Sequence, residues 1–503
     1  MVGCHRYPAP RMSAPSQSAT EPPHPTGSAV TGDDKRPGIF RAGSLVYNRS
    51  SLAWLFCWLL LADLSFMIVS QIEPSVLPVL LKNAGASDHH VAWILGTLVQ
   101  MTQLVLNPIY STCSDRTRTR WGRRIPYLFV VTPLASLLLA ATPYAPEIAA
   151  WLQQQDWASA IVRRAPGSPA VLIYGVLVFS FYLFYSGTSS IFFYLFRDVV
   201  PESHMGRFMA LFRMVGALGT FILNYWLLGI GVRLPHETFL ALAGLNLVGF
   251  MVLCCFVKEP EYPPPEPAAA AERRAPLRRG IATVVAYFRE CYSDPLHWWT
   301  YVCRLMVYAS IMVATFRIFF SLHELGMTVE EAGKAISWSS LLWVFVAYPV
   351  GLLVDRWKVF RVMKVALWIQ SVTYVLSFFF IRDSATFLAF SLVNGVLYWA
   401  IMLCQFMVGQ EVFPALKLGQ FFSANVVLQA VVIAAVVSPF CGWLFDTLNG
   451  TAARLLLPGF GSLEIGGYRY VMLMLGLVFF ISLLALYRVE ALLAARRRAT
   501  PSN

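Results

Sequence analysis

Twelve long apolar runs are the feature that most constrains the fold of this chain. Each has about 20 residues or more, the length that an α-helix needs to cross the hydrocarbon core of a bilayer. Only helices and closed barrels satisfy their backbone hydrogen bonds in lipid, and these runs lack the alternation of barrel strands. With only 13% charged residues, the chain is predicted to be an all-α integral membrane protein with twelve transmembrane helices. We place them at 51–72, 90–112, 126–145, 170–196, 207–230, 237–257, 297–322, 335–354, 360–381, 385–409, 421–445 and 467–488.

The basic residues gather in alternate connections between these runs. They lie at 116–124, 197–207, 273–279, 356–364 and 496–498. The intervening connections, such as 323–334, carry far fewer. Lys and Arg accumulate in loops on the cytoplasmic side, so the pattern predicts a multi-pass protein of the inner or plasma membrane with cytoplasmic N- and C-termini. Membrane topology then explains the net charge of +12, and no nucleic-acid partner is expected.

Two segments without apolar runs delimit the predicted domains. Residues 1–49 are rich in Pro, Ser, Thr and Gly and are predicted to be a disordered cytoplasmic tail. Residues 258–294 are Pro-rich and then basic, which suits a cytoplasmic linker between two bundles. The other domains are a six-helix bundle at 50–257, a second six-helix bundle at 295–489 and a basic cytoplasmic tail at 490–503.

Two sequence elements of the first bundle recur in the second. The loop SDRTRTRWGRR at 114–124 has a fainter copy in YPVGLLVDRWK at 348–358. The segment DVVPESHMGRF at 198–208 parallels EVFPALKLGQF at 411–421, with a carboxylate, a helix-ending Pro and a Gly at matching places. Two pseudo-symmetric six-helix repeats are typical of carriers that bind a solute near the middle of the membrane, between the repeats.

The loop at 114–124 resembles the loop between helices 2 and 3 of major facilitator superfamily carriers. Within that superfamily it is most similar to the glycoside–pentoside–hexuronide:cation symporters and the sucrose:proton symporters. The resemblance implies that the loop gates the cytoplasmic side. A carboxylate beside arginines can form charge-assisted bonds in one conformation and lose them in another. The expected gating residues are Asp115, Arg116, Arg123, Arg124, Arg197, Asp198, Asp355 and Arg356.

Charged residues inside the apolar runs are candidates for the solute pathway. A charge at the bilayer centre costs about 2.5–3.5 kcal/mol on insertion scales, so it normally faces a cavity or a partner. Asp63 and Arg213 resemble an aspartate of helix 1 and an arginine of helix 5 in the glycoside symporters, which implies that both contact sugar. Arg317 in the seventh run needs an anion. Glu73, at the outer end of the first run, is one candidate, and a charged substrate is another.

Uncharged polar and aromatic residues complete the expected pathway. Aromatic faces together with amide and hydroxyl groups suit a sugar, which has apolar CH faces and many hydroxyls. We therefore expect a secondary carrier that moves a sugar or glycoside by alternating access. The candidate residues are Tyr185, Asn224, Gln370, Asn394, Tyr398, Gln405 and Asn425.

The chain departs from the resembling families where the coupling ion would bind. Gln103, Leu106 and Asn107 stand where the melibiose-type carriers have two aspartates and an asparagine, so a sodium site is not expected. A proton is the expected coupling ion, with Asp63 as its best carrier, and facilitated diffusion without an ion is the alternative. No other cofactor and no metal site is expected.

Three other classes of function are alternatives to a sugar carrier. A carrier for an organic anion, a drug or a lipid is one alternative, and a deep unpaired Arg317 would favour it. A non-transporting sensor on the same fold is another, although such a protein normally has an added signalling domain. The sequence contains no nucleophile elbow, phosphate-binding loop or H-E-x-x-H motif, so an enzyme is not expected. The expected partners are a small solute and the lipid bilayer, and the expected state is a monomer.

Overall fold

The computed structural model describes residues 39–156, 168–262, 287–414, 417–448, 453–457 and 461–499. Most of the predicted N-terminal tail (1–38), most of the linker (263–286) and the last four residues (500–503) lie outside the described residues. The described part is mainly helical and forms two halves, residues 39–262 and 287–499.

The first half contains a short hairpin followed by helices that cross the molecule. Its elements are β1 (Ile39–Ala42), β2 (Leu45–Asn48), α1 (Arg49–Ser70), α2 (Ile72–Ser75), α3 (Leu77–Asn83), α4 (Asp88–Ala92), the π-helical turn η1 (Trp93–Leu98), α5 (Val99–Arg116), α6 (Ile125–Ala141), η2 (Thr142–Tyr144), α7 (Ala145–Gln153), α9 (Pro169–Val199), α10 (Glu202–Ile222), the π-helical turn η3 (Leu223–Leu227), α11 (Leu228–Arg233) and α12 (Pro235–Phe256).

The second half repeats this order of crossings and adds a second hairpin. Its elements are α14 (Pro295–Thr315), α15 (Arg317–His323), α16 (Val329–Trp357), α17 (Val359–Phe380), α18 (Ser384–Val412), α19 (Leu418–Val432), the π-helical turn η6 (Ile433–Val437), α20 (Ser438–Leu448), β3 (Ala453–Leu457), β4 (Gly461–Ile465), η7 (Gly467–Arg469) and α21 (Tyr470–Ala499).

Equivalent helices pack together in the two halves. α1 packs on α12 as α14 packs on α21, and α6 packs on α9 as α17 packs on α18. α5 packs on α9 as α16 packs on α18. This repeated packing agrees with the predicted fold of two pseudo-symmetric bundles. Within the described residues, eleven helices are long and apolar enough to cross a membrane.

The twelfth crossing is the continuous helix formed by α4, η1 and α5. It is as long as the others but is not among the eleven, because it carries polar residues such as Gln100, Gln103 and Asn107 along its length.

Elsewhere, large apolar side chains such as Leu137, Leu240 and Phe345 are at least 62% exposed. Exposed apolar side chains on long helices are expected for a protein whose outer surface contacts lipid.

Local sequence signals set several helix starts. The side chain of Asn48 accepts the backbone N–H of Ser51 at the start of α1, Thr328 caps α16, and Asp383 caps α18. These side chains satisfy N–H groups that have no partner within the helix. Pro169 begins α9 and Pro295 begins α14, positions where the missing N–H of proline costs nothing.

The prediction of a disordered tail up to residue 49 was wrong for its last part. Strands β1 and β2 pair in antiparallel register, with Phe40 opposite Tyr47 and Ala42 opposite Leu45. Phe40, Leu45 and Tyr47 pack against the core of the first half. Gly43 has a φ of +58° in the intervening turn, a conformation that glycine adopts readily. Two short, mostly apolar segments joined by the two-residue turn Gly43–Ser44 favour a hairpin over a disordered chain.

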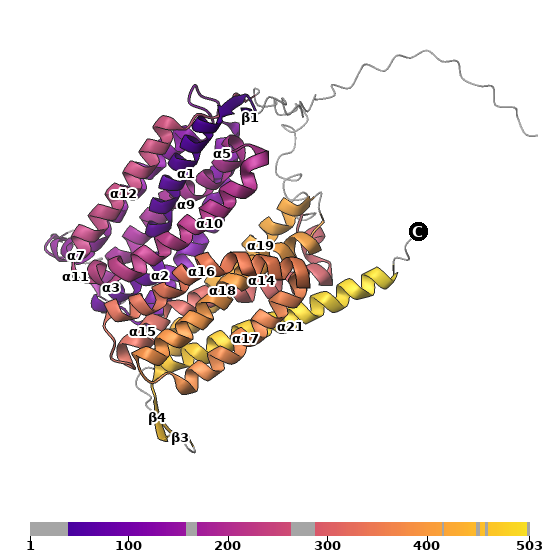
Figure 1. Cartoon of the computed structure of the whole chain (residues 1–503). Helices are drawn as coiled ribbons and strands as arrows, with labels where there is room; N and C mark the ends of the chain where they lie inside the picture. The colour runs from indigo at the N-terminus through magenta and orange to yellow at the C-terminus, as the bar shows by residue number, and fades with distance from the viewer. Residues whose placement is uncertain are drawn as a thin grey trace, which may run out of the picture.

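The two halves meet at one end of the molecule and diverge toward the other (Figure 1). β1, α19 and the end of α21 lie at the diverging end, which we call the linker side because residues 258–262 and 287–294 are also there. α3, α11, α15 and the β3–β4 hairpin lie at the opposite end, which we call the far side. Contacts between the halves include those of α4 with α20, of α5 with α19, of η1 with η6, and of η3, α10 and α11 with α16.

Candidate functional site

A cavity of about 610 Å³ lies between the two halves. This volume is within the range of small-molecule sites, roughly 300–1,000 Å³. Both halves contribute polar side chains, so a bound solute would contact both at once. The polar lining residues are Ser70, Gln71, Ser75, Gln100, Gln103, Thr220 and Asn224 from the first half, and Tyr308, Ser310, Thr315, Arg317, Ser339, Ser340, Tyr374, Asn394, Tyr398, Trp399 and Gln429 from the second.

The first crossing of each half is interrupted where it meets the cavity. Gln71 lies between α1 and α2, and Phe316 lies between α14 and α15. The cavity is lined by Gln71 and by Arg317, the first residue of α15. Interrupted helices are typical of solute sites in carriers, because the interruption presents polar groups in the middle of the membrane. One half thus contributes an amide and the other a guanidinium.

The first-half wall is built from α5 and the π-helical turn η3. Gln100 and Gln103 are three residues apart, which places them on one face of α5. Asn224 lies in η3, and π-helical turns are frequent at functional sites. The Oδ1 atom of Asn224 accepts a hydrogen bond of 3.0 Å from Ser75, and its Nδ2 donates to the carbonyl of Thr220 at 2.9 Å. These bonds hold the Asn224 amide in one orientation.

The second-half wall is organised around Asn394 of α18. Its Oδ1 accepts hydrogen bonds from Thr373 at 2.7 Å and from Gln370 Nε2 at 3.5 Å. Gln370 is fully buried and does not line the cavity, so it supports Asn394 from behind. Tyr398 and Trp399 lie about one turn further along α18 and add aromatic rings to the lining.

The structure brings together part of the predicted pathway. Asn224, Arg317, Asn394 and Tyr398 line the cavity. Tyr185 lies in the interior of the first half, with its hydroxyl 3.3 Å from the carbonyl of Phe66. The side chain of Glu73 lies outside the described residues. The predicted residues that the cavity lining does not include are Asp63, Tyr185, Arg213, Gln370, Gln405 and Asn425.

Asp63 lies in the interior of the first half. Its side chain is 0% exposed, and neither carboxylate oxygen has a hydrogen-bond partner in the part of the chain that the structure describes. Arg213 of α10 is exposed, and its guanidinium lies 5.8 Å from the ring centroid of Phe212. The two residues form no ion pair here, so the expected pair of sugar-binding charges is not assembled in this conformation.

A buried arginine explains why Gln405 and Asn425 are absent from the lining. Arg304 of α14 is 5% exposed, and its Nε donates to Oδ1 of Asn425 at 2.6 Å. Its Nη1 donates to the carbonyl of Gln405 at 2.5 Å. The guanidinium also lies 4.8 Å from the ring centroid of Phe422. A buried arginine needs such acceptors, which here are the side-chain amide of Asn425 and the backbone carbonyl of Gln405, both within the second half.

A network of charges holds the loop after α5 on the linker side. Asp198, at the end of α9, accepts hydrogen bonds from Arg123 at 2.9 Å and from Arg124 at 2.5 Å. Arg124 also lies 3.2 Å from Asp115, and Arg123 lies 3.6 Å from it. Two carboxylates and two arginines thus join the ends of α5 and α9 to the start of α6. All four residues belong to the predicted gating set, and all four lie in the first half.

Glu259 completes this linker-side network. Its carboxylate accepts the backbone N–H groups of Arg123, Arg124 and Ile125 at 3.0, 2.8 and 2.7 Å, which satisfies the exposed start of α6. Gly122 has a φ of +109°, and a Cβ there would lie 2.5 Å from the Glu259 carboxylate carbon. The glycine of the loop motif is therefore required both by the backbone conformation and by this contact.

The remaining predicted gating residues do not join a network. Arg116 and Arg197 are exposed in the first half, and Asp355 and Arg356 are exposed at the end of α16. Within the described ranges, no ion pair involves any of these four residues. The two copies of the loop therefore have the same kind of sequence but different surroundings.

Hydrogen bonds join the halves on the far side. The carboxylate of Asp446 in α20 accepts the backbone N–H groups of Asp88 and His89 at 2.7 and 2.9 Å, so a second-half residue caps α4 of the first half. The carboxylate of Asp88 in turn accepts the hydroxyl of Tyr468 at 3.0 Å and pairs with Lys82 at 2.6 Å. We call Asp88, Asp446 and Tyr468 the far-side latch.

Close backbone approach accompanies the far-side latch. A Cβ on Gly442 of α20 would lie 2.6 Å from the Cα of His89, and a Cβ on Gly333 of α16 would lie 2.3 Å from the carbonyl oxygen of Asn224. An ion pair of 2.8 Å joins Arg233 to Glu330 nearby. Among the described residues, Arg233–Glu330 is the one ion pair between the halves, and together with the hydrogen bonds of the far-side latch it holds the halves together on the far side.

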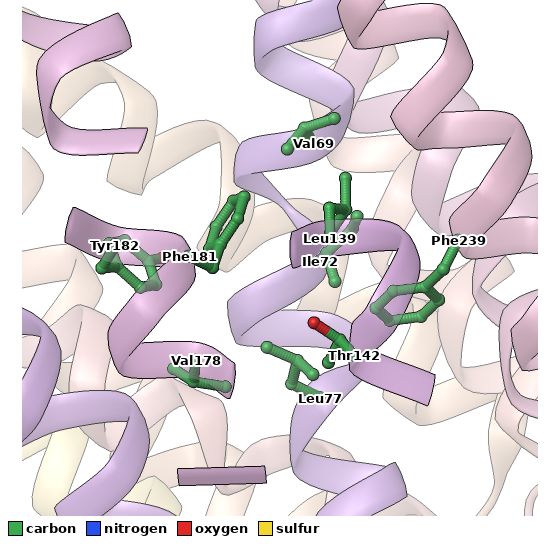
Figure 2. A pocket seen from close by; sticks show the side chains of 9 residues that line it. All are labelled: Val69, Ile72, Leu77, Leu139, Thr142, Val178, Phe181, Tyr182 and Phe239. Carbon is green, nitrogen blue, oxygen red and sulfur yellow. The ribbon is translucent and has the colours of Figure 1, made fainter. Parts of the chain in front are cut away.

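A separate void of about 10 Å³ lies inside the first half. Figure 2 shows its mainly apolar lining, which includes Val69, Leu139 and Phe181, together with the hydroxyl of Thr142. A void of this size holds about one water molecule. It is too small for a solute, and the cavity between the halves is the candidate site.

Most of the residues in the first-half wall of the cavity were not predicted from the sequence. Gln100 and Gln103 offered a usable signal, because two amides three residues apart mark one polar face in an apolar run. Gln71 offered another, since Pro74 follows it closely and proline interrupts helices. Ser339 and Ser340 offered none, because serine is common wherever membrane helices pack closely.

Comparisons with known proteins agree on the fold. The sequence model of the Major Facilitator Superfamily matches residues 55–439. No curated protein sequence matches the chain significantly. Two bacterial proteins in inward-facing states, a homolog of the human lysosomal transporter Spinster and a homologue of the iron transporter ferroportin, each have a TM-score of 0.60 at 14% identity. The alignments include 88% and 87% of this chain, respectively, and 98% of the length of each of the two similar proteins.

A D-xylose-proton symporter has a TM-score of 0.56 at 12% identity, with 87% of this chain and 97% of that chain covered. At such identities the similarity concerns the fold alone. The solutes named for these structures differ, and therefore they select no solute for this chain.

Proposed function

Because this chain belongs to the Major Facilitator Superfamily, a family of membrane transporters, we propose that it is a secondary carrier whose solute is a sugar or glycoside, moved by alternating access. One observation carries the proposal: amides, hydroxyls and aromatic rings from both halves line a single cavity of about 610 Å³. Gln100, Gln103 and Asn394 can donate to and accept from hydroxyl groups. Tyr398 and Trp399 suit the CH faces of a sugar ring.

Transport by purified protein in liposomes tests this proposal. Counterflow of labelled monosaccharides, disaccharides and glycosides is measured for the wild type and for Gln103→Leu. We expect uptake of at least one sugar, and Gln103→Leu to lower its apparent affinity by about tenfold, since a lost hydrogen bond to the solute costs about 1.5 kcal/mol. Gln154→Leu, at an exposed position outside the cavity, is the matched control. Counterflow with lipids or drugs but with no sugar would refute the sugar assignment.

Asp63 is the proposed carrier of a coupling proton. An ionised carboxylate with no hydrogen-bond donor, fully removed from solvent, is costly, and binding a proton removes that cost. Sugar addition should then alkalinise the medium outside the liposomes, and Asp63→Asn should abolish the proton flux while sugar counterflow persists. Glu261→Gln, an exposed acid of the linker, is the control. An unchanged proton flux in Asp63→Asn would exclude this role.

We place the linker side in the cytoplasm and the protein in the inner or plasma membrane. The basic residues 116–124 and 496–498 lie on that side, as the charge rule for membrane proteins requires. The proposed functional unit is a monomer, because one chain supplies both walls of the cavity. Reaction of a Cys at Arg120 with an impermeant maleimide in intact cells would contradict the orientation. A dimeric mass by light scattering would contradict the monomer.

A further inference from the structure

The cavity between the halves contains one charged side chain in its described lining. That residue is Arg317, and among the described side chains no Asp, Glu, Lys or His accompanies it in the lining; the side chain of Glu73 lies outside the described residues. Elsewhere in the described part of the chain, arginines that are mostly buried have acceptors that hold them. Arg124 is paired with Asp198, Arg469 with Glu324, and Arg304 with two amide residues. Arg317 is the exception among them.

The surroundings of Arg317 are neutral. Its Nε is buried and has no hydrogen-bond partner in the described structure. Its side chain interacts with the hydroxyl of Tyr374, a neutral group that also interacts with the amide of Gln370. A guanidinium that is partly removed from solvent normally pairs with an anion, because an unpaired charge is expensive to keep away from water. The described protein supplies no anion at this point.

We propose that the solute supplies the missing anion. The transported sugar carries a carboxylate, which pairs with the Arg317 guanidinium. The planar guanidinium matches the two oxygens of a carboxylate and can bind both at once. The neutral amides of Gln100 and Gln103 on the opposite half then bind the hydroxyls of the sugar. A hexuronate is the simplest solute with both features. This inference rests on the proposed sugar-carrier function and adds the substrate class.

A negatively charged solute would contact both halves of the carrier through Arg317 and the amides of α5. Arg317 belongs to the second half and the amides of α5 belong to the first, so a sugar acid bound by both would connect the halves. A neutral sugar would leave the guanidinium unpaired inside the cavity. The carrier should therefore prefer the acid over the matched neutral sugar, and that preference should depend on Arg317.

Binding of matched sugar pairs to the purified full-length protein tests the inference. The probes are D-glucuronate against D-glucose and D-galacturonate against D-galactose, with glucose 6-phosphate and lactate as further anions. We expect the wild type to bind a uronate about ten- to hundredfold more tightly than its neutral partner. Arg317→Gln should remove this preference, weakening uronate binding more than binding of the neutral sugar, and Arg317→Lys should restore part of it. Arg382→Gln, an exposed arginine between α17 and α18, should behave as the wild type.

The outcomes separate this inference from the sugar-carrier proposal. Equal binding of acid and neutral sugars, unaffected by Arg317→Gln, would refute the inference and leave the sugar carrier standing. Arg317-dependent binding of lactate as tight as that of the uronates would support anion recognition but refute the sugar. Preference for glucose 6-phosphate over both uronates would refute the carboxylate and indicate a phosphate. Thermal unfolding of Arg317→Gln near the wild-type temperature would show that a loss of preference is not a loss of fold.

Discussion

The two repeated charged elements, the loop at 114–124 with its copy at 348–358 and the segment at 198–208 with its copy at 411–421, are similar in sequence and different in surroundings. In the first half, Asp198 contacts two arginines within 2.9 Å and has a side-chain exposure of 10%. Its counterpart in the second half, Glu411, has a side-chain exposure of 42% and lies 3.5 Å from Arg497 alone. Asp355, the counterpart of Asp115, is exposed and has no ion pair within the described ranges. The charged residues of these elements therefore form buried ion pairs in the first half, whereas their counterparts in the second half stay exposed.

Contacts on the far side explain why, in the described part of the chain, the charged residues of the second-half loop have no partner from the first half in this conformation. Asp446 caps α4 across the interface, and Tyr468 reaches Asp88, so the halves are joined at that end. On the linker side the first-half network uses its own acceptors, Asp198 and Glu259. In alternating access, only one side of the solute site opens at a time. An exposed Asp355 is thus consistent with a partner that is found only after the linker side closes.

The largest expected effect comes from removing the buried carboxylate of the first-half network. Asp198→Asn leaves Arg123 and Arg124 without their main acceptor. Breaking a buried ion pair typically costs about 3–5 kcal/mol, whereas an exposed pair contributes about 0–1 kcal/mol. We expect Asp198→Asn to lower the unfolding temperature clearly and the matched Glu411→Gln to change it little. Thermal unfolding in detergent measures both, and equal shifts would show that the two copies are energetically alike.

A smaller effect is expected from the far-side latch. Asp446→Ala removes the cap that the second half adds to α4 beside its own N-cap Ser87. A cap is worth about 0.5–2 kcal/mol, so the change should shift the carrier toward a state open on the far side by about two- to thirtyfold. Spin labels at Glu237 and Arg382, on opposite halves, report the distance across that side after exposed cysteines are replaced. Asp383→Ala also removes a helix cap, but within one half, and should leave this distance distribution unchanged. A shift of the same size in both variants would refute the latch.

The smallest effect on stability is expected at the second copy. Asp355 is exposed and unpaired here, so Asp355→Asn should change the free energy of unfolding by less than about 0.5 kcal/mol. If Asp355 gains an arginine partner in the linker-closed state, its loss should slow sugar counterflow by up to about fivefold. Unfolding and counterflow measured on the same preparation separate these effects. Unchanged counterflow would remove Asp355 from the gate.

The fold was largely predictable from the sequence, and the site was predictable only in part. Long apolar runs identify crossing helices because lipid leaves the backbone no other partners. The segment at 88–116 was found among these runs although Gln100 and Gln103 make it the most polar crossing. Asn394 and Tyr398 line the cavity, whereas Gln405 and Asn425 do not. A polar side chain projects from one face of its helix. The sequence of that helix alone does not show which neighbouring helix, or which cavity, lies against that face.

The sequence by itself determined the membrane class, the two related halves and the superfamily, because these depend on length, hydropathy and a local loop motif. It also determined that Gly122 and Asp198 belong to recurring elements. Only the tertiary structure decided that Glu259 caps α6, that Asp446 caps α4 across the halves, and that Arg317 lines the cavity without an acidic neighbour in the described lining. Each of these facts joins residues far apart in the chain. Such contacts depend on how helices rotate and meet, and local periodicity does not specify that arrangement.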